Sequence, residues 1–154
     1  IEPYVREQLE QAGIWNPEYE TAKRPWYLDT IDLIRSRFHL TTDFVTRGRA
    51  YFSEDYPIEP KALKKNVLKH EKLKEWLPIL AERLDTVKAF TAEETEKTIR
   101  ALAEELGIKV GILTNSTRAV VTGQLAGPGL FDILTVLGRD RVVRRLHKAT
   151  ALFE

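Results

Sequence analysis

The sequence of 154 residues contains no cysteine and has three histidines, His39, His70 and His147, which lie far apart. Without cysteine the chain forms neither a disulfide nor a zinc site with thiolate ligands. The histidines do not show the H-E-x-x-H spacing of a metal-binding helix. We therefore expect no disulfide framework and no metal site within the chain.

Long apolar runs are missing as well. None approaches the roughly 18 to 20 residues that a membrane-spanning helix needs, and the opening residues IEPYVREQLEQAG do not have the pattern of a signal peptide. We expect a soluble, cytoplasmic protein that makes no membrane contact. Because the chain begins with Ile1 and contains no methionine, we also expect it to be part of a larger protein.

The patterns of catalytic and phosphate-binding loops are absent too. The turn 127-GPG-129 has neither the preceding strand nor the lysine of a phosphate-binding loop. Paired carboxylates at 93–94 and 104–105 lie on an amphipathic segment, where a solvated outer face explains them better than acid/base chemistry. We assign no catalytic residue and expect no cofactor in this chain.

Apolar residues that recur every three or four positions predict an all-α protein. The segment 71–87 places its leucines on one face, and the segment 91–107 opens with Thr91 and Glu94 in capping-box spacing and closes at Gly107. Alternating strand patterns are nearly absent. Further helices are expected at 3–12, 24–52, 60–69, 110–121, 130–137 and 141–149.

A hinge near residues 88 to 91 suggests how the chain is divided. We expect a connecting segment at 1–25, a first small helical bundle at 26–88 and a second at 89–154. Charge is uneven: residues 1–34 have seven acids and three bases, a net charge of −4, whereas the rest has 21 bases and 16 acids, a net charge of +5. A site for a polyanion should lie in the basic part.

Arginines gather at two places. Unstacked RNA bases are read by guanidinium planes, aromatic faces and hydrogen-bond donors, while phosphates attract scattered basic residues. Each residue also has an ordinary interpretation: the aromatic side chains as core, Arg144 and Arg145 as solvated charges, and Arg118 as a cap of the preceding carbonyls or a partner of Asp132. The first group is Arg35, Arg37, Arg47 and Arg49 with Phe38, Phe44, Tyr51 and Phe52; the second is Arg118, Arg139, Arg141, Arg144 and Arg145.

The residues of the second group resemble a known family. The segments 117-TRAVVTG-123 and 128-PGLFDILTVLGRDRVVRRL-146 are similar to the carboxy-terminal signature of bacterial-type glutamyl-tRNA synthetases. That signature is roughly L-R-x-A-x-T-G, a short gap, and P-x-L-F-x-x-L-x-x-L-G-[KR]-[DE]-R-x-x-x-R-L. Upstream segments at 33–56 and 89–111 agree in order, so the resemblance covers about residues 26 to 149.

The resemblance implies two helical bundles that form the anticodon-binding region of a class I aminoacyl-tRNA synthetase. It implies glutamate tRNA as the partner, a monomer, and a full-length glutamate–tRNA ligase that uses ATP and Mg in its catalytic core. The His-Gly-His and Lys-Ser-Lys-Ser type motifs of that core have no counterpart in this chain. The chain by itself is therefore expected to bind RNA without catalysis.

The matched motifs also imply site residues. The anticodon site is expected to contain Arg118, Thr122, Gly127 and Leu130, with Arg37 reading the third anticodon base and Arg35 as its competitor. The family often has Thr or Ser where this chain has Gly127, which removes one hydroxyl. Weaker phosphate contacts are expected from Arg47, Arg141, Arg144 and Arg145.

Two other functions stay open from the sequence. One is a helical protein-interaction module of the same ancestry that docks through Trp15, Trp26 and Leu28 without binding RNA. The other is a free-standing enzyme, which finds little support in the residues. Binding to tRNA that weakens with salt distinguishes the RNA-binding function from the interaction module, because displaced counterions drive phosphate binding.

Overall fold

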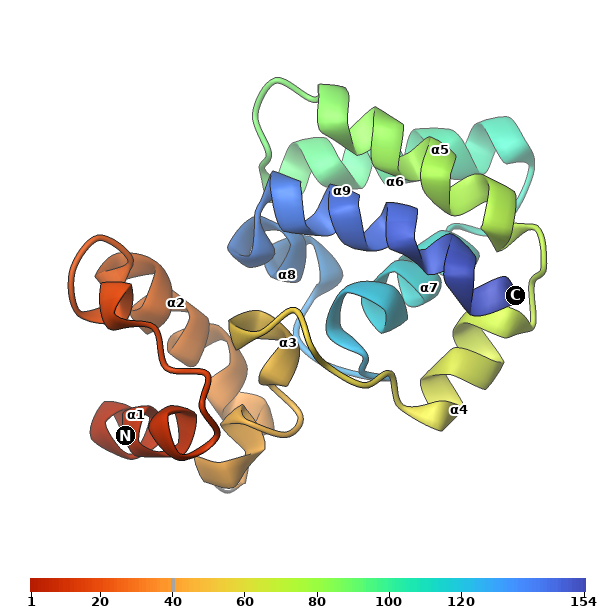
Figure 1. The fold of residues 1–154 in the computed structure, drawn as a ribbon. Coiled ribbons are helices and arrows are strands. Elements are labelled where there is room, and N and C mark those ends of the chain that lie inside the picture. The colour runs from red at the N-terminus through yellow and green to blue at the C-terminus, as the bar shows by residue number, and fades with distance from the viewer. Residues whose placement is uncertain (40) are drawn as a thin grey trace. The chain divides into compact units, whose positions relative to one another are not determined.

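The computed structural model describes residues 1–39 and 41–154, and this described part consists of helices, turns and loops without a strand (Figure 1), as the periodicity predicted. The chain divides into two compact units, unit 1 (Ile1–Tyr56) and unit 2 (Pro57–Glu154). Helices on both sides of residue 88 belong to unit 2. The expected segments 1–25, 26–88 and 89–154 therefore differ from the compact units, and as domains of a longer protein they stay a prediction.

Unit 1 is a set of short helices around aromatic side chains. Its first part contains α1 (Glu2–Gln11), the 3₁₀ helix η1 (Pro17–Glu20) and α2 (Arg24–Ile34). The rings of Tyr19 and Tyr27 stack with centroids 5.0 Å apart, and Trp15 meets both edge-on. Trp26 and Phe52 complete the cluster. Each well-placed ring pair stabilises by about 0.5–1.5 kcal/mol beyond the burial of its area, and this cluster belongs to a core that also contains buried aliphatic side chains.

The prediction of one continuous helix over 24–52 is wrong. The segment is broken into α2, η2 (Arg35–Arg37), η3 (Thr41–Phe44) and α3 (Arg49–Phe52). Leu40, which the predicted helix included, lies outside the described residues.

Local side-chain contacts explain this break. The Asp43 carboxylate accepts a hydrogen bond of 3.0 Å from the backbone N–H of His39, a local bond that competes with helical pairing. Gly48 packs so closely on the Phe38 ring that a Cβ there would lie 2.9 Å from a ring carbon. The aromatic residues Phe44, Tyr51 and Phe52 are buried, so their interpretation as core is confirmed, whereas Phe38 is only half-buried.

Unit 2 is a bundle of longer helices with an aliphatic core. The side chains of Leu77, Leu80, Leu84, Ile99 and Leu113 are fully buried, and burying each such side chain contributes about 1.5–3 kcal/mol. In Figure 1, α9 runs beside α5. The helices are α4 (Pro60–Ala62), the π-helical η4 (Leu63–Leu68), α5 (Leu73–Thr86), α6 (Ala92–Leu106), α7 (Val110–Thr122), α8 (Leu130–Leu137), α9 (Arg139–Lys148) and the 3₁₀ helix η5 (Ala149–Phe153).

The predicted ends of α6 agree with the structure. The Thr91 hydroxyl accepts a hydrogen bond of 3.2 Å from the backbone N–H of Glu94, and Gly107 ends the helix with a left-handed φ of 67°. None of the helices in the described part is long and apolar enough to cross a membrane.

Arg139 closes the carboxyl end of α5, which has no capping glycine. Its Nη1 donates to the carbonyls of Leu84 (3.2 Å) and Asp85 (2.7 Å), and its Nη2 donates to those of Val87 (2.5 Å) and Lys88 (3.4 Å). Helix ends leave such carbonyls unsatisfied. We call this arrangement the Arg139 clamp; it joins the start of α9 to the end of α5.

Candidate nucleic-acid interface

The connection between α7 and α8, residues 123–129, is fixed where it leaves α7. Gly123 has a φ of 73°, and a Cβ there would lie 2.1 Å from the carbonyl oxygen of Pro57. Only glycine combines this left-handed conformation with such a close approach. The Gly123 carbonyl also accepts a hydrogen bond of 2.8 Å from the backbone N–H of Glu59. The start of unit 2 and the end of α7 therefore hold each other in place.

Thr122 orders the first step of the connection. Its hydroxyl donates to the Arg118 carbonyl at 2.7 Å and accepts from the backbone N–H of Gln124 at 3.1 Å. The side chains of Thr122 and Leu130 are both 4% exposed. These two predicted site residues support the turn from within the unit rather than project into solvent.

Arg118 reaches from the last turns of α7 to the far end of the connection. Its Nη1 donates a hydrogen bond of 2.5 Å to the Pro128 carbonyl. A Cβ on Gly127 would lie 3.5 Å from the same nitrogen. The guanidinium therefore contacts the backbone of the turn, and its five N–H groups allow other contacts at the same time. Sequence reasoning missed the Pro128 carbonyl as a partner, because a backbone acceptor ten residues away leaves no residue pattern.

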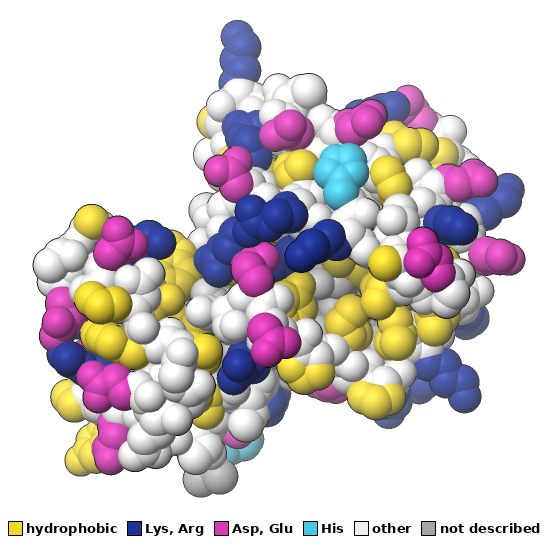
Figure 2. All heavy atoms as spheres, viewed as in Figure 1, with side chains coloured by type: hydrophobic (Ala, Val, Ile, Leu, Met, Phe, Trp, Pro, Cys, Tyr) yellow, Lys and Arg dark blue, Asp and Glu magenta, His cyan; other side chains and the backbone are white. Residues whose placement is uncertain are grey.

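The arginines of α9 have different surroundings. Arg144 is exposed, whereas Arg145 is 3% exposed and donates to the Val121 carbonyl at 2.6 Å. The Arg141 Nε donates to the Leu137 carbonyl at 3.0 Å. Figure 2 shows basic side chains gathered over the α8 and α9 region of the visible face. Arg145 is therefore not the solvated charge or surface phosphate ligand that the sequence suggested: its guanidinium holds α9 against the end of α7.

The arginines of unit 1 lie on irregular backbone. Arg35 pairs with Asp32 at 3.2 Å, and both side chains are mostly exposed. Arg37 is exposed, and its carbonyl accepts a hydrogen bond of 3.0 Å from Arg47, whose guanidinium lies 5.2 Å from the centroid of the Phe38 ring. Arg47 therefore supports the turn that presents Arg37, in addition to the phosphate role predicted for it.

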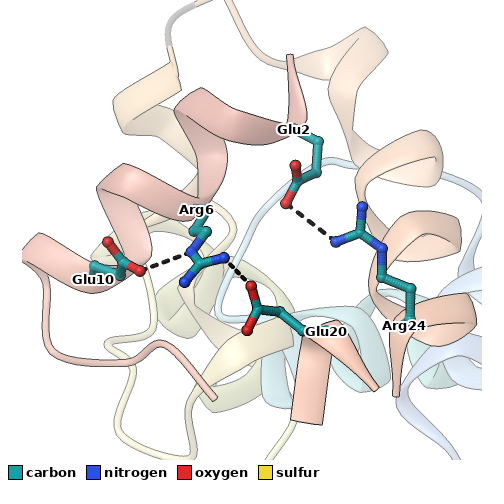
Figure 3. A network of polar contacts seen from close by, with 5 residues as sticks. All are labelled: Glu2, Arg6, Glu10, Glu20 and Arg24. Atoms are coloured by element: carbon teal, nitrogen blue, oxygen red, sulfur yellow. Dashed lines mark hydrogen bonds and ion pairs between the residues drawn. The ribbon is translucent and has the colours of Figure 1, made fainter. Parts of the chain in front are cut away.

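Carboxylates surround other arginines of unit 1. Figure 3 shows Arg6 between Glu10 and Glu20, and Arg24 facing Glu2 at 3.4 Å. Among the described residues, no three His, Asp or Glu side chains are grouped so that they could hold a metal ion. The network neutralises charge at the surface of α1, η1 and α2, which does not favour a polyanion there.

Of the predicted anticodon residues, the structure therefore brings four together in unit 2. Arg118, Thr122, Gly127 and Leu130 surround the helix-to-helix turn, and Arg37 belongs to unit 1. The site combines a fixed backbone turn, a guanidinium and an amphipathic helix start. Such an arrangement offers hydrogen-bond donors to acceptors on a nucleic-acid base.

Comparison with known proteins defines the class of domain. The family model described as "Anticodon binding domain" matches residues 2–150, and the chain belongs to this family. Curated relatives include the glutamate–tRNA ligase of Desulfotalea psychrophila, 56% identical over 149 residues, or 97% of this chain and 30% of that protein. A glutamate–tRNA ligase of Thermus thermophilus is 37% identical in an alignment 155 residues long, which covers 98% of this chain and 30% of that protein. The chain thus spans about 30% of the length of these relatives.

Solved structures agree on the fold. A glutamate tRNA ligase from Elizabethkingia meningosepticum, crystallised with its amino acid, superimposes with a TM-score of 0.79 at 22% identity, over 99% of this chain and 28% of that one. A glutamate-tRNA synthetase from Elizabethkingia anophelis gives a TM-score of 0.70 at 22% identity, over 97% of this chain and 27% of that one. The all-α fold expected from the sequence is therefore confirmed.

Proposed function

We propose that this chain is the anticodon-reading part of a glutamate–tRNA ligase of the cytoplasm and that it binds the anticodon loop of glutamate tRNA as a monomer. Activation of glutamate with ATP and Mg belongs, in this proposal, to a catalytic core outside the chain. The relatives named above are glutamate–tRNA ligases matched over about 30% of their length. The chain contributes recognition rather than catalysis.

The observation that carries the proposal is the position of Arg118. Its hydrogen bond to the Pro128 carbonyl orients the guanidinium at the turn before any RNA arrives. A side chain that is already ordered loses less entropy when a ligand binds. Gly127 places no side chain beside that guanidinium, so a base can approach the arginine and the turn backbone together.

Titration of labelled anticodon stem-loops with the 154-residue chain tests the proposal. We expect the glutamate stem-loop to bind, to weaken as salt rises, and to bind more tightly than a stem-loop with a scrambled anticodon. One good base contact gives discrimination of about 1–3 kcal/mol. Absence of binding at low salt would refute the proposal and support the interaction module. Of its predicted docking residues, Trp15 and Trp26 are half-buried in the aromatic cluster of unit 1 and Leu28 is exposed.

Arg37 gives the proposal a test of specificity. Glutamate and glutamine anticodons share a middle U and differ in the third letter, C against G. The pairing edge of cytosine offers acceptors to a guanidinium, whereas guanine presents donors and is larger. We expect the full-length ligase to charge glutamate tRNA and reject glutamine tRNA, and Arg37→Gln to relax that rejection, with Arg35→Gln as the matched comparison. Unchanged discrimination in Arg37→Gln and lost discrimination in Arg35→Gln would assign the role to Arg35.

A further inference from the structure

We propose that a lysine-lined hollow in unit 2 binds phosphate groups of the RNA backbone outside the anticodon; this inference rests on the proposed function. The hollow, about 280 Å³ in volume, lies between η4 and the start of α7. Its basic lining comes from both sides: Lys65, Lys69 and His70 from one, and Lys109 from the other. Among the residues that the structure describes, no carboxylate lines it, so several positive charges face one open space without compensation.

The sequence around η4 is strongly basic. Residues 60–74 contain six lysines and one acid, a net charge of +5, in a chain whose net charge is +1. Lys65, Lys69 and Lys109 are exposed, and within the described residues none of these three lysines forms an ion pair. Like charges held close together without acidic partners repel each other, and a bound anion relieves that repulsion.

The start of α7 adds to the positive field. Helix starts leave backbone N–H groups unsatisfied and carry the positive end of the helix dipole, which Asp, Ser, Thr or Asn usually compensates. Here Lys109 occupies the cap position and makes no side-chain cap bond. A Cβ on Gly111 would lie at an ordinary 3.7 Å from Asn115, so packing does not require glycine there. The missing side chain leaves the backbone of the first turn open to a ligand.

Lysine is suited to a contact with the phosphate backbone. The lysine ammonium is a point charge on a flexible stem, which binds phosphates without selecting a base. The hollow is also open to solvent and its lysines are exposed. This fits the phosphates of an RNA strand better than a small anion that must be enclosed.

The geometry of α7 connects the hollow to the anticodon site. Ile112 lines the hollow and Thr122 ends the helix at the turn. At 1.5 Å of rise per residue these positions are about 15 Å apart along the axis. Roughly four nucleotides of a stacked strand cover this distance at about 3.4 Å each. The length of α7 is therefore within the reach of a short RNA strand.

A charge-matched pair of variants tests the inference. The variant Lys65→Gln/Lys109→Gln removes one lysine from each side of the hollow, and Lys88→Gln/Lys97→Gln removes two exposed lysines of unit 2 that do not line it. We expect the first variant to weaken glutamate and scrambled stem-loops by the same factor, on the order of tenfold at low salt, and to make the salt slope shallower by about two units. The second variant should change neither the affinity nor the salt slope, and both variants should keep the parent's thermal unfolding curve.

The outcomes separate the two proposals. Equal affinity and salt slope in parent and Lys65→Gln/Lys109→Gln would overturn the lysine site, even if Arg118→Ala still loses discrimination. Equal losses in both double variants would also overturn it, since net charge would then explain the effect. If the parent binds all stem-loops alike and the first variant still weakens them, the lysine site stands and the anticodon-reading function fails.

Discussion

The two units differ in net charge and in the arginine contacts that join their helices. In unit 1, Arg6, Arg24 and Arg35 meet carboxylates at the surface. In unit 2, Arg83 and Arg100 also pair with carboxylates, but Arg139, which joins two helices, donates to backbone carbonyls. An ion pair cancels two charges, whereas a carbonyl is satisfied without neutralising the guanidinium. Unit 1 has seven bases and ten acids, a net charge of −3, and unit 2 has 17 bases and 13 acids, a net charge of +4. Unit 1 therefore has a negative net charge and unit 2 a positive one, although both units contain arginine ion pairs.

The cores of the two units also differ in the side chains that fill them. Unit 1 combines a cluster of aromatic rings with buried aliphatic side chains, while unit 2 packs mainly aliphatic side chains between longer helices, whose ends are closed by glycines and by Arg139. We expect close backbone contacts and hydrogen bonds at helix ends to contribute most to the stability of unit 2. Exposed ion pairs should contribute little to the stability of unit 1.

The largest effect is expected from Gly123→Ala. The new Cβ would meet the Pro57 carbonyl oxygen at 2.1 Å in a left-handed conformation, and we expect a loss of about 3 kcal/mol or more in the free energy of unfolding. Chemical denaturation measures it. Gly107→Ala is the matched control, since its φ is also positive at 67° but no atom lies within 4 Å of the added Cβ, and about 1 kcal/mol is expected there. Equal losses of unfolding free energy in the two variants would show that the close approach of Gly123 to Pro57 does not affect stability.

The next largest effect concerns the Arg139 clamp. Arg139→Ala leaves several carbonyls at the end of α5 without their donor, and hydrogen bonds to a charged group are worth about 1.5–3 kcal/mol. We expect a loss of this size in the unfolding free energy. Arg35→Ala, which removes an exposed ion pair of unit 1, should cost about 0.2–1 kcal/mol. If Arg35→Ala destabilised the protein more than Arg139→Ala, the comparison between the units would be broken.

Arg118→Ala tests the role of the arginines of unit 2 through their effect on RNA affinity. We expect a loss of about 1–3 kcal/mol in affinity for the glutamate stem-loop and less for a scrambled one, because the variant loses a base contact. Arg144→Ala, on the exposed face of α9, should weaken both stem-loops alike. Fluorescence anisotropy titrations measure both. Equal affinity of parent and Arg118→Ala would leave Arg118 with its structural hydrogen bond as its sole role.

The smallest effect involves the ion pair of unit 2 between Arg83 and Glu105. The hydrogen bond from Arg83 lowers the pKa of the Glu105 carboxyl below its usual value. Because the folded-state pKa is depressed, the pair stabilises the fold above the pKa of the unfolded chain, and this contribution is lost as pH falls through the folded-state pKa. Carboxyl-carbon NMR titration should show a low midpoint for Glu105, which Arg83→Gln moves back upward. A midpoint that Arg83→Gln leaves unchanged would contradict the pairing.

Long periodic segments made much of the fold predictable. The structure has helices at Leu73–Thr86 and Ala92–Leu106, where periodicity and capping predicted them at 71–87 and 91–107. The break within 24–52 was missed because it depends on a side-chain bond to His39 and on the packing of Gly48 against a ring, neither of which changes the apolar spacing.

The candidate site was less predictable. Arg145 was placed at the surface because an arginine in a helix usually faces water, but its hydrogen bond to the Val121 carbonyl makes its burial favourable. The lysine hollow was missed because Lys65 and Lys109 are distant in sequence and meet only through the packing of η4 with α7. A signal was available: six lysines and one acid in residues 60–74.

The Arg139 clamp also has a consequence for folding kinetics. The carbonyls that it contacts precede it by 51 to 55 residues. Closing so long a loop costs entropy before the contact rewards it, so the clamp is expected to form after the rate-limiting step. A contact absent from the transition state alters unfolding far more than refolding. Arg139 would then mainly slow unfolding. The Arg139→Ala variant is expected to refold at nearly the parent rate but to unfold faster.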